Sequence, residues 1–372
     1  MSERVHPQSI TVTYHRSYNY GASLQAYALQ KTLIAVGFQN AILDFYRNPY
    51  EKLPLLCGSL RLCIARLASR FYGFLHRKER RTLIEGFDRF TSNKLILTHQ
   101  YLSLKELIEN PPVADCFFAG SDQVFTLREP EFVVKRNFLE FVNDRGKKYS
   151  YAASIADYDL SSDEKAQYIS YLDSFDTISV REKKAADLLS SLCQRNIRVD
   201  VDPVFFLKKE DWEAIVEKPE FPSPYILYFQ VNSNAYSNSV LKWMKKKYHL
   251  PVVCIQTNPH VSVDADKVIL SASPEAFLGW IHDAEVVVTT SFHGTAFSLI
   301  FEREFFTLIK EGSNPTRIIN LLHSFDLEKR MITGESELKG EYASINWDLV
   351  REKMSTYSSE SREYLRRVFN QF

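Results

Sequence analysis

Glycine is scarce in this sequence and poorly grouped. Only 12 of the 372 residues are glycine, and no two of them form the G-x-G pair that opens a dinucleotide-binding fingerprint. The spacing G-x-x-x-x-G-K followed by Ser or Thr is also missing, which excludes a P-loop. Any phosphate-bearing ligand must therefore be held by other helix starts or by side chains.

Cysteine and histidine show no metal-binding spacing. The five cysteines, Cys57, Cys63, Cys116, Cys193 and Cys254, make no C-x-x-C pair, and the nine histidines make no H-x-x-H. This usage indicates reduced structural thiols, no dedicated metal site and no cofactor.

Charge excess and long apolar runs are absent as well. Lys and Arg number 46 and Asp and Glu number 46, so the basic excess of a nucleic-acid-binding protein is missing. Residues 1–10 have no signal-peptide core, and no uncharged run is long enough to span a bilayer. We expect a cytoplasmic protein that does not bind nucleic acid.

Short β-branched or aromatic runs alternate with amphipathic helical stretches, a pattern typical of an α/β fold with parallel sheets. A helix is expected over 22–35, ended by Gly37, and another over 347–368. Strands are expected at 9–14, 41–45, 115–119, 148–154, 177–180, 197–201, 225–229, 252–255 and 285–289.

The acidic, proline-rich stretch 217–224 indicates a linker between two such domains. We expect an N-terminal domain over 1–216 with a helical insertion around 50–110, a C-terminal domain over 217–345, and a terminal helix over 346–372. Two Rossmann-like domains facing each other across a cleft would result. Within the insertion, Ser59 to Leu75 is basic and amphipathic; it would either pack on the core or lie on an anionic membrane surface.

The segment EVVVTTSFHGTAFSLI, residues 285–300, has the strongest local pattern. An apolar strand ends near Ser291, and a helix is expected to begin at Gly294 or Thr295. Ligands bind at the carboxyl ends of such strands, and a helix start offers N–H groups to an anion. His293 would then be a general acid, a general base or a cation for phosphate. The alternative is a histidine that only braces the turn.

Other candidate residues follow earlier strands. In FFAGSDQVF, the backbone of Gly120 and Ser121 could cradle an anion, and Asp122 and Gln123 could hold hydroxyl groups; a plain helix cap is the alternative. Arg181 ends the strand in ISVRE, where an exposed guanidinium would suit a carboxylate or phosphate; a salt bridge is the alternative.

Two further segments give weaker signals. Asn19 and Gly21 of YNYG could contact a phosphate or a sugar hydroxyl, or form an ordinary turn. Arg317 of NPTRIIN stands at an expected helix start, where it would serve a ligand or the surface.

The order of NYGASLQAYALQ, GSDQVF, YAASIA, SVRE, VDPVF and TTSFHGTAFS resembles the polysaccharide pyruvyl transferase family over most of the chain. The resemblance implies a fold like the B-type glycosyltransferases. It also implies phosphoenolpyruvate as donor and a hexose hydroxyl pair as acceptor, in a surface glycan or its lipid-linked precursor.

The chain departs from this family at one position. Better-studied members have an arginine two residues before the motif histidine, where this chain has Ser291. If that arginine holds the donor's acid groups, Arg181 or Arg317 must replace it here. A nucleotide-sugar glycosyltransferase is the main rival interpretation, and a non-catalytic glycan-binding protein is the second; neither the acceptor sugar nor the oligomeric state follows from the sequence.

Overall fold

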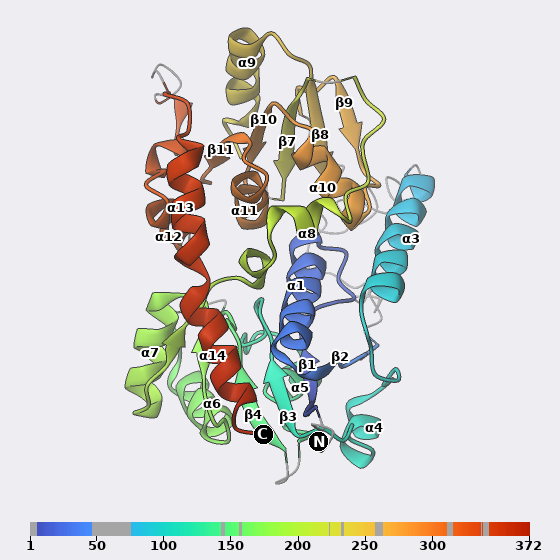
Figure 1. The fold of residues 1–372 in the computed structure, drawn as a ribbon, viewed down its shortest axis with the longest axis vertical. Helices are drawn as coiled ribbons and strands as arrows, with labels where there is room; N and C mark the ends of the chain where they lie inside the picture. The colour runs from blue at the N-terminus through green and yellow to red at the C-terminus, as the bar shows by residue number, and fades with distance from the viewer. Residues whose placement is uncertain are drawn as a thin grey trace, which may run out of the picture. The chain divides into compact units, whose positions relative to one another are not determined.

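The computed structural model describes residues 6–46, 76–142, 146–155, 158–222, 224–231, 234–256, 263–310, 315–335, 337 and 342–372. The basic segment expected over 59–75 lies outside these residues. The chain forms two compact units, one of Met1–Tyr46, Thr91–Asp211 and Asn346–Phe372, the other of Arg47–Phe90 and Trp212–Ile345. Each is a parallel sheet with helices (Figure 1).

The first unit is built on the parallel strands β1 (Gln8–Val12), β2 (Gln39–Ile42), β3 (Cys116–Ala119) and β4 (Lys147–Ser150), in the order β2-β1-β3-β4. Parallel bridges from Tyr149 to Thr177 and from Ala153 to Val180 extend β4 to the pair β5 (Ser179–Val180) and β6 (Arg198–Val199). Bridges on the other side join Ile42 of β2 to Leu97, and Phe45, which follows β2, to Tyr101. The strand order therefore reverses between β1 and β3, as in a doubly wound sheet.

The second unit repeats this topology. Its strands run β12-β11-β10-β7-β8-β9 and are all parallel. Their bounds are β7 (Ile226–Gln230), β8 (Val252–Gln256), β9 (Lys267–Ile269), β10 (Val286–Thr289), β11 (Glu304–Leu308) and β12 (Met331–Ile332). The order reverses between β7 and β10, and each of these two strands is buried along its whole length.

Helices connect the strands of both units. In the first these are α1 (Tyr20–Val36), α4 (Leu104–Glu109), α5 (Glu131–Asn137), α6 (Ser162–Asp173) and α7 (Lys183–Cys193), with the short η1 (Pro203–Phe206). In the second they are α9 (Ser237–Tyr248), α10 (Pro274–His282), α11 (Phe292–Ile300), α12 (Thr316–Ser324) and the short η2 (Glu328–Arg330). Both α3 (Arg77–Lys94) and α8 (Lys209–Glu213) cross from one unit to the other. None of the described helices is both long and apolar enough to cross a membrane.

The C-terminal segment differs from its expected form. Instead of one helix it contains α13 (Trp347–Tyr357) and α14 (Ser359–Phe369), which meet at Ser358, and it belongs to the first unit. Gly37 ends α1 with φ 128°, and a Cβ there would lie 2.5 Å from the ring of Phe369. The close approach of α14 to α1 therefore depends on a glycine at this position.

The unit boundary also differs from the expected one. It falls between Asp211 and Trp212, inside α8, a few residues before the stretch 217–224. Three strands, β9, β11 and β12, were not predicted from the sequence. The first is partly exposed, the second begins at Glu304 directly after Arg303, and the third has two residues.

Candidate active site

The carboxyl ends of β1 and β3 meet at the strand-order reversal of the first unit, and two predicted motifs adjoin this point. Asn19 is the N-cap of α1, and its Oδ1 accepts the Ala22 N–H at 3.3 Å. Gly21 is buried in the first turn of that helix. Residues 120–123 follow β3 directly. The structure thus brings the YNYG and GSDQ motifs to one edge of the sheet.

The GSDQ loop is closed by its own contacts. Ser121 is fully buried; its Oγ donates to the Ala152 carbonyl at 3.2 Å, and its carbonyl accepts from Thr13 Oγ1 at 2.9 Å. A Cβ at Gly120 would lie 3.1 Å from Thr11 and 3.3 Å from Leu29 of α1. Gly120 and Ser121 therefore pack the helix against the sheet, and the Gly120 N–H is bonded to the Val12 carbonyl at 2.8 Å.

Asp122 and Gln123 lie nearer to solvent than Ser121. Asp122 has φ 79°, and its carbonyl accepts the Ser154 N–H at 2.8 Å. Its Oδ1 accepts the Gln123 N–H at 2.9 Å, and Gln123 is exposed. These two side chains keep the accessibility that acceptor binding requires.

Arg181 is buried, not exposed as the sequence suggested. The residue is 8% exposed, and its guanidinium lies 2.9 Å from the fully buried carboxylate of Asp202. Its Nη2 also donates to Ser121 Oγ. Burial lowers the pKa of Arg181, but the carboxylates of Asp202, Asp122 and Glu182 together outweigh this and hold that pKa above its ordinary value. The salt-bridge alternative is thus the observed one.

In the second unit, α11 begins at Phe292, two residues before the expected start. Ser291 is its N-cap: Ser291 Oγ accepts the Gly294 N–H at 3.4 Å, and the Ser291 carbonyl accepts the Thr295 N–H at 3.0 Å. The N–H groups of Gly294 and Thr295 are therefore committed to the cap. The backbone donors that precede them in the first turn belong to Phe292 and His293.

Gly294 and Thr295 hold the strand–turn–helix junction together. A Cβ at Gly294 would lie 2.3 Å from Thr289 Oγ1, which itself donates to the Phe229 carbonyl at 3.0 Å and accepts the Ser291 N–H at 3.0 Å. Thr295 is fully buried and bonds Thr307 at 2.8 Å. Both residues therefore shape the turn that leads into α11.

His293 and Arg317 are the charged or titratable candidates of this unit. His293 is half-buried in the first turn of α11, edge-on to the Phe292 ring at 5.2 Å. Arg317 is the second residue of α12, which follows β11. Because β10 and β11 are parallel neighbours, the chain leaves both at the same sheet edge, before α11 and α12. Each helix start also favours an anion.

Comparison with known proteins settles the family. A sequence model of the polysaccharide pyruvyl transferase family matches residues 19–309. The chain belongs to the polysaccharide pyruvyl transferase family. It is therefore a transferase. No curated protein matches it.

Solved structures confirm the two-domain, B-type glycosyltransferase fold that the resemblance implied. The UDP-GlcNAc 2-epimerase from Neisseria meningitidis bound to UDP-GlcNAc is 10% identical, with a TM-score of 0.51, over 98% of this chain and 93% of that one. The S. aureus MnaA–UDP structure is 12% identical, also at 0.51, over 96% and 89%. At this identity the likeness concerns the fold alone.

The matched residues of this pyruvyl transferase family member include every motif named above except that of Arg317, which lies beyond residue 309. Ser291, where better-studied members have arginine, acts as a helix cap in this structure. Ser291 therefore fixes the start of α11.

Sequence reasoning missed two groups of polar residues. In the first unit, Asp44 lies 3.3 Å from His15 Nε2 and accepts two hydrogen bonds of 2.6 Å from Arg16. Burial raises the pKa of Asp44, but the hydrogen bonds from Arg16 and His15 outweigh it, so that this pKa lies well below its ordinary range. The sequence signal that could have found this group is Asp44 itself, the one charged residue in the apolar run AILDF.

The second missed group is a pair of glutamines. Gln230 and Gln256 end β7 and β8, pair in register, and are 4% and 5% exposed. Each closes a strand that is otherwise apolar or aromatic, YILYFQ and VVCIQ. A polar residue at the end of a buried strand was the signal that could have found them.

Proposed function

We propose that this enzyme transfers the pyruvyl group of phosphoenolpyruvate to two hydroxyls of a hexose, forming a cyclic ketal on a surface glycan or its lipid-linked precursor. Family membership supports the reaction class. The observation that carries the assignment of the site is the position of His293, in the first turn of α11 at the carboxyl end of β10.

Donor binding is assigned to the second unit. Phosphoenolpyruvate carries a carboxylate and a phosphate, and both need cations or N–H donors. The starts of α11 and α12 supply N–H groups at one sheet edge, and Arg317 adds a planar guanidinium suited to either acid group. Arg181 is less suited, because Asp202 already neutralises it.

The proposed chemistry consumes one proton at carbon and releases two from hydroxyls. The donor methylene carbon takes a proton, which leaves cationic character on the neighbouring carbon. One hydroxyl oxygen bonds to that carbon and loses its proton. The bond from carbon to the phosphate oxygen breaks, inorganic phosphate leaves, and the second hydroxyl closes the ring as it loses its proton. His293 serves one of these proton transfers, as acid or as base.

The first unit positions the acceptor loop in this proposal. Arg181 fixes Ser121 through a hydrogen bond and pairs with Asp202. Asp122 and Gln123, which follow Ser121, then present a carboxylate and an amide to sugar hydroxyls. The segment 59–75 is the proposed contact with the membrane, where a lipid-linked acceptor would reside.

The experiment is release of inorganic phosphate from phosphoenolpyruvate in the presence of p-nitrophenyl glucosides, galactosides and mannosides. His293→Ala is expected to lower turnover by roughly 100-fold or more. His323→Ala is the matched control, because the side chain of His323 is 80% exposed on α12 and paired with Glu328.

Normal turnover in His293→Ala would overturn the assignment of the site. Failure of the wild type to release phosphate with any of the glycosides, together with consumption of a UDP-hexose, would overturn the reaction. The rival reading as a nucleotide-sugar glycosyltransferase would then stand.

A further inference from the structure

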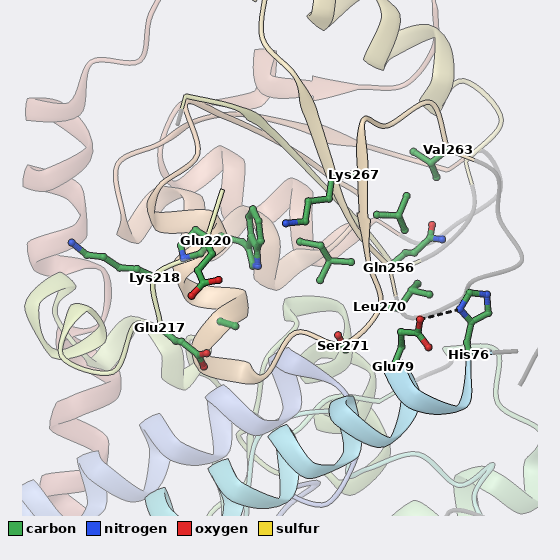
Figure 2. A pocket seen from close by; sticks show the side chains of 15 residues that line it. His76, Glu79, Glu217, Lys218, Glu220, Gln256, Val263, Lys267, Leu270 and Ser271 are labelled. Carbon is green, nitrogen blue, oxygen red and sulfur yellow. Dashed lines mark ion pairs between the residues drawn. The ribbon is translucent and has the colours of Figure 1, made fainter. Parts of the chain in front are cut away.

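A pocket of about 790 Å³ opens in the second unit, apart from the SFHG motif (Figure 2). It lies at the carboxyl ends of β8 and β9 and is also lined by α10, the start of α3 and residues 217–220. In Figure 2, Glu79 and Glu217 reach it from one side and Lys267 and Gln256 from the other. Its size is typical of small-molecule sites.

Gln256 brings unused hydrogen-bonding capacity to this pocket. Its oxygen is 3.9 Å from the Cys254 thiol, a weak donor, and none of the described residues accepts a hydrogen bond from its amide nitrogen. On the neighbouring strand, Gln230 points to the same face, and its buried Oε1 receives no hydrogen bond from the described part of the chain. Of the two, Gln256 lines the pocket, and a ligand that bonds its amide there would satisfy a polar group that is nearly removed from water.

Trp280 adds an aromatic surface with a polar edge. The residue is 6% exposed and lines the pocket, and no acceptor for its indole N–H occurs among the residues that the structure describes. Lys267 Nζ stands 5.5 Å from the centre of its ring, and Lys267 is exposed. An indole beside amides and carboxylates is suited to a ring that has C–H groups on its faces and hydroxyls at its rim.

The charges of the lining argue against a phosphorylated ligand. Three carboxylates, of Glu79, Glu217 and Glu220, face two lysines, Lys218 and Lys267. His76 lies 3.9 Å from Glu79. Phosphate sites concentrate cations and N–H donors, whereas carboxylates accept hydrogen bonds from neutral hydroxyls.

We infer that this pocket binds a neutral sugar residue of the acceptor glycan, remote from the hydroxyls that receive the pyruvyl group. This inference rests on the proposed function, because only that function makes the bound sugar part of an acceptor. The strand β7 separates β8 from β10, so the pocket and the SFHG turn are about 10 Å apart along the sheet edge. A single hexose does not span that interval, so the acceptor is an oligosaccharide.

The test is fluorine NMR of the full chain labelled with 5-fluorotryptophan, which gives four resonances, that of Trp280 being assigned by Trp280→Phe. Cellobiose, lactose and maltose are titrated separately, and UMP and inorganic phosphate serve as anionic probes. At least one disaccharide is expected to shift the Trp280 resonance, and neither anion is. Gln256→Leu is expected to weaken that binding by about tenfold, while Gln167→Leu, an exposed glutamine of α6, leaves it unchanged.

Three results would overturn the inference: a Trp280 resonance unmoved by all three sugars, a shift with UMP or phosphate, or equal sugar binding in Gln256→Leu. The melting temperature separates loss of binding from loss of fold, since Gln256→Leu keeps a similar volume and is expected to melt no lower than wild type. The titration contains no phosphoenolpyruvate. If a sugar shifts the Trp280 resonance but the enzyme does not turn over phosphoenolpyruvate, the sugar-binding pocket is supported and the proposed donor is contradicted.

Discussion

The two strand-order reversals have the same topology, but the polar residues beside them are held differently. At the first, between β1 and β3, Ser121 and Arg181 are buried and bonded to each other and to neighbouring protein groups. At the second, between β7 and β10, His293 is half-buried, and the nearby Gln230 is buried with an oxygen that no described group satisfies. At the first edge these polar residues hold the fold, whereas the proposed function assigns those of the second edge to a ligand.

This difference shows that a position at a strand end does not determine whether a polar residue has a structural or a functional role. The sequence offered Arg181 as the first candidate for the donor's acid groups and Arg317 as the second, since each is an arginine beside an expected strand end or helix start. A buried carboxylate lies beside the first, at Asp202. That pairing holds Arg181 in the fold, whereas Arg317 is the cation that we propose for the donor.

The largest effect is expected when the guanidinium of Arg181 is removed from the first edge. Arg181→Ala leaves the buried Asp202 carboxylate uncompensated and is expected to lower the free energy of unfolding by about 3–5 kcal/mol. Urea denaturation measures this change. Lys183→Ala is the control, because its side chain is 72% exposed and its pair with Asp187 is worth about 0.5 kcal/mol or less. Equal effects of the two substitutions would show that the first edge is not held by Arg181.

Asp44→Asn tests the other polar cluster of the first unit. It is expected to reduce the free energy of unfolding by about 1.5–3 kcal/mol at neutral pH, because two charge-assisted hydrogen bonds from Arg16 are weakened. The folded-state pKa of Asp44 is depressed, so its contribution is present above the unfolded pKa of about 4 and is lost as pH falls below it. Wild type and variant should therefore differ by a constant amount above about pH 5 and converge in acid. A difference that grows on acidification would contradict this account.

A smaller effect sharpens the picture of the second edge. Gly294→Ala places a methyl group 2.3 Å from Thr289 Oγ1 and is expected to cost about 1–3 kcal/mol. A Cβ at Gly334, in the same unit, would meet no atom within 4 Å, so Gly334→Ala is the matched control and should cost little. Thermal melts of the two variants compare them directly. If they melt at the same temperature, the turn before α11 is looser than the structure has it.

Most of the fold could be predicted from the sequence. Nine expected strands correspond to β1 to β8 and β10, and those of the second unit, β7, β8 and β10, were marked by apolar or aromatic runs. The start of α11 was placed late, since Ser291, three residues before Gly294, was assigned to the loop although it is the N-cap. Phe292 and His293 thereby became helical.

The site was predicted less completely than the fold. The motifs located both sheet edges, but burial of Arg181, Ser121 and Thr295 depends on packing between distant segments. Gln230 and Gln256 were missed because each looks like an ordinary strand end, and their significance appears only when β7 and β8 pair in register. Pairing of parallel strands is a property of the tertiary fold.

The central claim is that the second edge, not the first, holds the donor, and a thermal-shift titration with phosphoenolpyruvate on wild type and Arg317→Ala tests it most directly. At about 100 times the dissociation constant, a bound donor should add about 2.7 kcal/mol of stability to the wild type. The account predicts that Arg317→Ala loses most of this gain while its unliganded melting temperature stays near that of wild type. An undiminished gain in Arg317→Ala, or a flat response in both proteins, would contradict it.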